Sequence, residues 1–165
     1  MKKLRRILIV LLVVLVVIQF IKPARNISAQ VSANDISVRF PVSANVHDIL
    51  AKACYDCHSN NTVYPWYANI QPVAWWLNNH VRDGKRHLDF SEFNSYSVAR
   101  QYKKLEETID EVKHGEMPLD SYTWIHKNAI LTETEKESLY TWAQQIRDTI
   151  KARYPADSLV LPKRK

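Results

Sequence analysis

Apolar residues along this chain form one continuous run near the start and several helically spaced sets after it. The run covers residues 7–21 and is interrupted only by Gln19, with four basic residues before it and Lys22 after it. As a helix it would be roughly 22 Å long, which is shorter than the roughly 30 Å hydrocarbon core of a bilayer. We expect a transmembrane anchor over 7–21, or alternatively the apolar part of a cleaved signal peptide.

The polar segment that follows, residues 22–42, lacks clear periodicity, and we expect a linker there. Ser43 or Asn45 can then cap a helix that leads into the cysteine pair. A second helix is expected to open at Pro72 and to end at Gly84. Between these two helices the Ser, Asn and Pro content predicts a loop.

Two longer helices are predicted in the second half of the chain. Apolar residues at helical spacing cover 98–114, and Gly115 is a suitable stop. Thr132 and Glu135 have the spacing of a capping box, which opens a last helix that ends before Pro155. No stretch shows a strand pattern of useful length. The sequence therefore predicts an all-α domain of about four or five helices over 43–155, with a basic tail at 156–165.

The net charge of +6 comes from the two ends of the chain. Seven basic residues lie within 2–6 and 163–165, which leaves 16 basic and 17 acidic residues in the rest. Because the body is nearly neutral, it lacks the basic surface that nucleic-acid binding requires, and we expect no nucleic-acid partner. The basic residues 1–6 are expected to stay in the cytoplasm, which exports everything after the apolar run.

Both cysteines lie in one motif, Cys54-Tyr55-Asp56-Cys57-His58. A structural zinc site needs four ligands, and the chain has no second cysteine pair. A thioredoxin-like dithiol follows a strand, whereas a helix is predicted here. A plain disulfide is possible in an oxidising compartment but gives His58 no role. The motif favours a fourth interpretation, the covalent attachment of one c-type haem.

The chemistry of haem c explains this spacing. Each thiol adds to one of two vinyl groups on the porphyrin, and the two intervening residues let one helical turn span them. The residue after Cys57 then lies under the iron, where His58 can supply an imidazole ligand. Export agrees with this interpretation, since c-type haem is attached outside the cytoplasm. We therefore expect Cys54, Cys57 and His58 to hold one covalent haem c.

The second axial ligand of a c-type haem is commonly Met or His. Apart from the initiator, the only methionine is Met117, which stands before Pro118 in a loop after a predicted helix. This placement favours Met117 as the sixth ligand, although it could instead pack on the core. The alternatives are an open position or one of the remaining histidines: His47, His80, His87, His114 and His126.

Aromatic residues are dense after the motif and are candidates for the wall of a haem pocket. They are Tyr55, Tyr64, Trp66, Tyr67, Trp75 and Trp76. The carbonyl of Pro65 or Pro72 is a candidate acceptor for the His58 ring. Arg82 and Lys85 could neutralise haem propionates, although each also suits a solvated surface.

These motifs resemble the small bacterial haem-binding domains of c-type cytochrome character that are found in exported proteins. The resemblance covers about residues 43–150 and rests on Cys54, Cys57 and His58, the YPWY run at 64–67, the Trp pair at 75–76 and GEMP at 115–118. It implies a covalent haem c and a helical fold similar to monohaem class I cytochromes c. The longer insert between His58 and Met117 departs from the smallest of those.

The leading hypothesis is a non-enzymatic electron carrier, anchored in the inner membrane with its haem domain in the periplasm. Its expected partners are the membrane and redox proteins of the envelope. Signal cleavage would instead give a secreted periplasmic protein. A haem-based sensor with a displaceable sixth ligand is the alternative function. A peroxidase is a third class, but it usually needs an open site and often a second haem.

Overall fold

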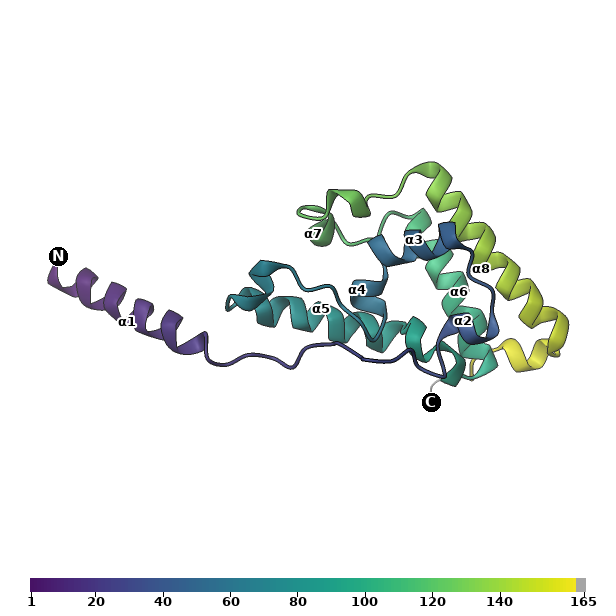
Figure 1. Cartoon of the computed structure of the whole chain (residues 1–165), viewed down its shortest axis with the longest axis horizontal. Coiled ribbons are helices and arrows are strands. Elements are labelled where there is room, and N and C mark those ends of the chain that lie inside the picture. The colour runs from purple at the N-terminus through teal and green to yellow at the C-terminus, as the bar shows by residue number, and fades with distance from the viewer. Residues whose placement is uncertain (163–165) are drawn as a thin grey trace.

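A computed structural model describes residues 1–162, and every regular element in that part of the chain is a helix (Figure 1). The longer helices are α1 (Lys2–Ile18), α3 (Ala44–Ala53), α5 (Val73–His87), α6 (Val98–Lys113) and α8 (Glu133–Arg153). The shorter α-helices are α2 (Ile36–Arg39), α4 (Tyr55–His58) and α7 (Asp120–Thr123). Single 3₁₀ turns are η1 (Trp66–Asn69), η2 (Phe90–Ser95), η3 (Lys127–Ala129) and η4 (Ala156–Leu159). The all-α prediction is confirmed.

Local capping signals set most of the helix ends. The Ser43 hydroxyl accepts a hydrogen bond from the Val46 amide at the start of α3. At the start of α8, the Glu135 carboxylate accepts from the Thr132 amide at 2.9 Å, and the Thr132 hydroxyl accepts from the Glu135 amide at 3.3 Å. These bonds satisfy amides that have no partner within the helix. The predicted caps of both helices are confirmed.

Helix α5 does not end at Gly84, so that prediction was wrong. It continues to His87, and the amide of Leu88 still donates to the Gly84 carbonyl at 2.8 Å. Three basic residues, Lys85, Arg86 and His87, form the last turn, where positive charge is favoured by the helix dipole.

The core lies where α3, α6 and α8 pack together, with α8 running beside α6 (Figure 1). Its fully buried side chains include Leu50 of α3, Leu105 of α6 and Leu139 of α8, together with Phe90 and Phe93 of η2. The indole of Trp142 donates to the Pro41 carbonyl at 3.1 Å, which ties α8 to the segment before α3. This frame leaves α4, α5 and the end of α6 to form a site.

Residues 22–42, expected as a linker, pack on the domain instead. Ile36 and Phe40 belong to the core and are 0% and 4% exposed. Asp35 caps α2 by accepting a bond from the Ser37 amide at 2.9 Å. The Asn26 side chain also donates to the Ser59 carbonyl at 2.8 Å. The segment lacks periodicity because it buries single side chains rather than the face of a long helix.

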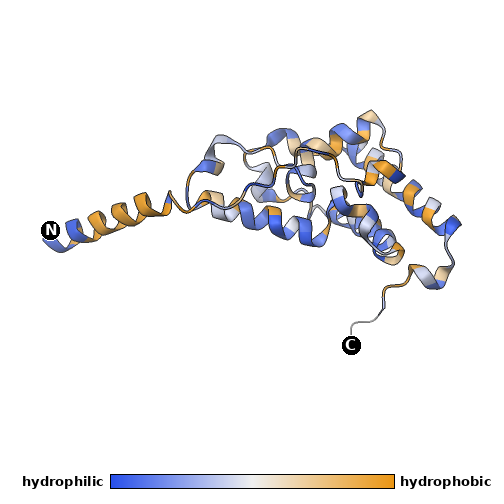
Figure 2. Cartoon of the chain, turned by 60° about the horizontal axis from the view of Figure 1, so that its bottom comes forward, coloured by the Kyte–Doolittle hydropathy of each residue, from blue (hydrophilic) through white to orange (hydrophobic). Residues whose placement is uncertain are grey.

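Helix α1 extends away from the rest of the molecule, and none of its residues is buried (Figure 1). Figure 2 shows its almost continuous apolar surface after a basic first turn. Among the helices of residues 1–162, α1 included, none has the combined length and apolarity to cross a membrane.

Candidate functional site

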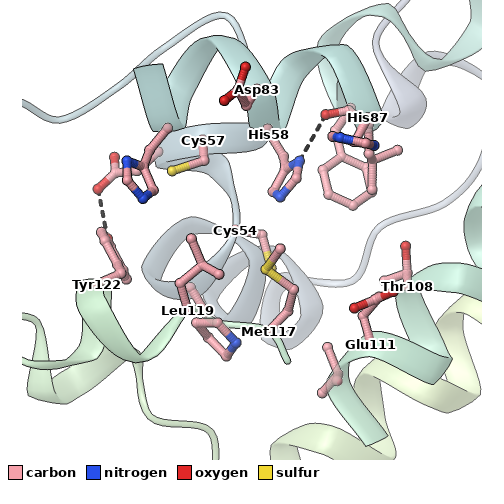
Figure 3. A pocket seen from close by; sticks show the side chains of 18 of the residues that line it. Cys54, Cys57, His58, Asp83, His87, Thr108, Glu111, Met117, Leu119 and Tyr122 are labelled. Carbon is pink, nitrogen blue, oxygen red and sulfur yellow. Dashed lines mark hydrogen bonds between the residues drawn. The ribbon is translucent and has the colours of Figure 1, made fainter. Parts of the chain in front are cut away.

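A cavity of about 430 Å³ lies between α4, α5, the end of α6 and the loop that leads to α7. Its volume is within the range of small-molecule and cofactor sites. Cys54, Cys57, His58 and Met117 all line it, and Figure 3 shows their side chains around one space. The structure thus brings together four side chains that come from the two ends of residues 54–117. The sequence had singled out the same four residues.

The cysteine motif lies on one turn of helix because the chain changes direction at Cys54, between α3 and α4. This residue ends α3 with φ −126° and ψ −46°, and α4 starts directly after it. The amides of Cys57 and His58 both donate to the Cys54 carbonyl, at 3.2 and 2.9 Å. Both thiols are free, and burial raises the pKa of Cys54 to about 12 and that of Cys57 to about 11.

The imidazole of His58 is held by one hydrogen bond. Its Nδ1 lies 2.9 Å from the Leu88 carbonyl oxygen. Because a carbonyl can only accept, Nδ1 carries the proton and Nε2 keeps a free lone pair. Burial lowers the pKa of His58, which favours the neutral ring that a metal requires. The sequence had suggested the carbonyl of Pro65 or Pro72 as the acceptor, and that was wrong.

Gly84 explains how α5 approaches the cysteine motif. A Cβ atom at this position would lie 2.7 Å from the Cys57 carbonyl oxygen and 3.0 Å from the Cys57 Cβ. Only a residue without a side chain permits this distance between α5 and α4. The close approach also brings Leu88, at the end of α5, to the His58 ring.

We predict that Gly84→Ala destabilises the protein and lowers the yield of haem-loaded protein. Alanine favours a helix over glycine by about 1 kcal/mol. The new methyl group meets backbone rather than a flexible side chain, so we expect overpacking to dominate, with a net loss of about 1–2 kcal/mol. Chemical denaturation and the haem-to-protein absorbance ratio measure both effects.

Arg82→Ala is the matched control, because Arg82 is exposed on α5 and, within residues 1–162, its side chain bonds only to Asn79 of the same helix. Its unfolding free energy should change by no more than about 0.5 kcal/mol. A Gly84→Ala protein that is more stable than the parent, with full haem loading, would show that α5 can move away from α4.

Met117 reaches the cavity because of how α6 ends. Gly115 has φ +78°, a left-handed conformation that suits glycine. The Gly115 amide donates to the Val112 carbonyl at 3.2 Å, and the Glu116 amide donates to the Glu111 carbonyl at 2.9 Å. These two bonds form a Schellman motif. The chain therefore turns back at the end of α6 and places the half-buried Met117 side chain along the cavity.

The other histidines divide into two groups. His80 and His87 of α5 line the cavity, whereas His47, His114 and His126 do not. The Nδ1 of His80 is bonded to the Trp76 carbonyl at 2.9 Å, and His126 is bonded through Nε2 to the Tyr67 hydroxyl at 2.7 Å. The structure thus reduces the histidine alternatives to Met117 from five to two.

Comparison with known proteins shows the family of the chain and its cofactor. The sequence model of a family described as a haem-binding domain matches residues 13–145. The chain belongs to this haem-binding domain family. No curated protein and no solved structure matches it. Haem is therefore the cofactor of the domain, and the matched range includes all four side chains.

The residues of the cavity fit a haem. The free Nε2 of His58 and the thioether of Met117 are both iron ligands in haem proteins. The two thiols have the spacing that covalent attachment requires. Apolar side chains of Leu88, Phe90, Val112 and Leu131 supply a wall for the macrocycle. The haem-binding domain thus has both a ligand set and an apolar surface in one place.

The structure does not support the other three interpretations of the motif, which are a zinc site, a redox dithiol and a disulfide. Within residues 1–162, no group of three or more His, Cys, Asp or Glu side chains is arranged to hold a metal ion. The same part of the chain has no strand, so the setting of a thioredoxin-like dithiol is missing. Cys54 and Cys57 are not joined by a disulfide.

The aromatic residues after the motif do not form the cavity wall that the sequence suggested. None of the six lines the cavity. Tyr64 accepts a bond from the Asn26 amide at 2.8 Å, and the Trp75 indole donates to the Ile21 carbonyl at 2.9 Å. Trp66 is 75% exposed. Tyr64 and Trp75 thus hold the segment before α2, and Trp66 faces solvent. The aromatic lining of the cavity comes from Phe90 and Tyr122.

The proposed propionate partners also lie elsewhere. Arg82 does not line the cavity, and Lys85 is engaged outside it by Asn26, Asn60 and Asp89. The lysine that lines the cavity is Lys104 of α6, which is paired with Glu107. The sequence could have indicated Lys104 as a lining residue, because residues 104, 108 and 111 have helical spacing and lie on one polar face of α6.

Tyr122 is a further lining residue that sequence reasoning missed. Its hydroxyl donates to the Asp56 carboxylate at 2.7 Å, and Asp56 stands between the two cysteines (Figure 3). A second Asp56 oxygen accepts from the Val63 amide at 2.8 Å. Burial and the Asp56 hydrogen bond raise the pKa of Tyr122. The two bonds connect the cysteine motif to α7 and to the loop after α4, and so fix its position.

Proposed function

We propose that this haem-binding domain is a c-type cytochrome that carries electrons in the cell envelope. Cys54 and Cys57 would hold one haem through thioether bonds, and His58 and Met117 would supply ligands to its iron. The observation that supports this best is the meeting of two thiols, a free imidazole nitrogen and a thioether at one cavity. When bound, the haem supplies a one-electron iron couple.

The chain's own residues suit an electron carrier rather than an enzyme. The bond to Leu88 fixes the tautomer and orientation of His58, so the imidazole is ready to bind without rearrangement. A thioether from Met117 favours the reduced state and so raises the potential. If His58 and Met117 both bind the iron, no position there would remain for a substrate, and we assign the site no catalytic reaction.

We further propose that the domain lies outside the cytoplasm and exchanges electrons with redox proteins at the membrane. The apolar residues 7–21 and the basic residues before them support this, as export or attachment signals. Covalent attachment to Cys54 and Cys57 requires the exported side of the membrane. Export would place the haem in the periplasm.

Optical spectra of the exported protein test this proposal. We expect a c-type spectrum in the reduced state, and in the oxidised state the weak long-wavelength band of Met-to-ferric coordination. Carbon monoxide should leave the reduced spectrum unchanged, because Met117 fills the sixth position. Absence of haem, in a host able to attach it, would contradict the proposal. The disulfide or dithiol interpretation of Cys54 and Cys57 would then be favoured.

The alternative function is a haem-based sensor whose sixth ligand leaves when a small molecule binds. One observation favours it: Met117 is only half-buried and lies in a loop. Prompt binding of carbon monoxide to the reduced protein would support this alternative. Turnover of peroxide with a reduced carrier would instead indicate an enzyme.

A further inference from the structure

The end of α1 is fixed to one corner of the domain, between η1 and α5. The Gln71 amide donates to the Gln19 side chain at 2.9 Å, and the Gln19 side chain donates to the Gln71 carbonyl at 3.2 Å. The Ile21 carbonyl accepts from the side chains of both Gln71 and Trp75, each at 2.9 Å. Gln71 is 1% exposed, whereas Gln19 is half-buried and Ile21 is exposed. Residues 19–21, which follow α1, therefore contact the domain through defined hydrogen bonds.

The same corner exposes large apolar side chains, which we name the corner patch. It consists of Trp66, Ile70, Val73 and Trp76, which are 75%, 44%, 36% and 47% exposed. Ile70 and Val73 flank the two residues at which η1 turns into α5, and the Trp76 amide donates to the Pro72 carbonyl at 3.2 Å. Ile70 and Val73 of the patch thus lie next to Gln71, where the chain from α1 contacts the domain.

Helix α1 needs an apolar environment of its own. Its apolar residues from Ile7 to Val17 are between 47% and 61% exposed. Lys2, Lys3, Arg5 and Arg6 precede this surface, and Lys22 follows the apolar run. Anionic lipid headgroups attract such basic residues, and acyl chains accept the apolar ones. Tryptophan, which is apolar with one polar N–H, concentrates at the boundary between the two.

We propose that the corner patch rests on the surface of a lipid bilayer, with the tryptophans at headgroup level. This inference rests on the membrane attachment in the proposed function and adds an orientation to it. A lipid surface accounts for the apolar helix, its basic flanks and the exposed tryptophans together. The junction at Gln71 holds the domain against that surface, so the domain does not swing on a flexible tether.

The proposed orientation also sets the distance between the cavity and the membrane. Helix α5 carries Trp76 near its start and the cavity-lining Gly84 two turns later. Eight residues of helix correspond to about 12 Å along the axis. Docking through the first turn of α5 therefore keeps the haem site close to the membrane, within reach of redox proteins embedded there.

Lipid photolabelling of the full-length, haem-loaded protein tests this proposal. The protein is reconstituted into vesicles of phosphatidylethanolamine and phosphatidylglycerol that contain a lipid with a diazirine near its headgroup. After irradiation, mass spectrometry locates the labelled peptides. We expect several-fold more label on the peptide with the corner patch than on the peptide with Val160 and Leu161. Those two residues are also exposed and apolar, at 71% and 44%, but belong to the C-terminal segment (Figure 2).

The double variant Trp66→Ser/Trp76→Ser should lose this label, while label on α1 persists. Val160→Ser/Leu161→Ser is the matched control and should leave the pattern unchanged. Label confined to α1, equal label on the two compared peptides, or failure of the protein to enter vesicles would overturn the proposal. The visible spectrum of each sample keeps the two proposals apart: a labelled patch on a protein without haem c would contradict the proposed function alone.

Discussion

Replacing both Cys54 and Cys57 with alanine is expected to produce a protein whose haem is removed by acidified organic solvent. Both thiols line the same cavity as the His58 ring, so both attachment bonds can form at one bound haem. Without them, only axial coordination and apolar contacts retain the group. Solvent extraction followed by gel electrophoresis with a haem stain measures the loss, which should be complete in the double variant and absent in the parent.

The single variants test whether each thiol forms its own bond. Cys57→Ala should retain a covalent haem on Cys54, and Cys54→Ala should retain it on Cys57, each with one thioether fewer. The pyridine haemochrome spectrum reports the number of unreacted vinyl groups, so its main band should shift in steps from parent to single to double variant. A double variant that still holds haem after extraction would show that neither cysteine attaches it.

Much of the fold follows from local signals in the sequence. Thr132 and Glu135 form the expected capping box, and the apolar spacing along 98–114 predicts α6 almost to the residue. The four side chains at the cavity were also found by spacing and residue type alone. Such signals depend on interactions within one helix or one turn, which a sequence records directly.

The remaining features depend on contacts between distant segments. Gly84 looks like a helix stop, but its purpose is to let α5 approach Cys57. The acceptor for His58 is Leu88, which is determined by the end of a helix that the sequence predicted to be shorter. Ile36 lies in an aperiodic segment, yet it is fully buried. Local patterns do not reveal which surfaces meet, so these features required the structure.

The two ends of α5 connect the site to the rest of the molecule. Its last turn supports the cysteine motif through Gly84 and brings Leu88 to His58. Its first turn carries Trp76 of the corner patch and the Trp75 indole, which binds the Ile21 carbonyl. Helix α5 therefore joins the corner patch to the residues that position the His58 ring. If the corner patch docks on a membrane, we expect a change there to alter the orientation of the domain without altering the cavity.

Replacing Met117 with leucine is expected to lower the reduction potential and to open the iron to carbon monoxide. Leucine keeps a similar volume against the core but has no ligand atom. Axial ligands set haem potentials over a range of about 0.8 V, and methionine lies toward the upper part. We expect a fall of on the order of 0.1 V or more. Spectroelectrochemical titration measures the potential, and the long-wavelength band of the oxidised protein should disappear.

Two further variants separate ligation from packing at this loop. Leu119→Ala removes bulk from the same cavity wall without touching a ligand, and should leave the long-wavelength band and the carbon monoxide response unchanged. Met117→His restores a sixth ligand, so the iron should no longer bind carbon monoxide, while the potential stays low.

An unchanged potential in Met117→Leu would remove Met117 from the ligand role. The remaining candidates would then be His80 and His87, the other histidines at the cavity, and single alanine variants of each would identify the ligand.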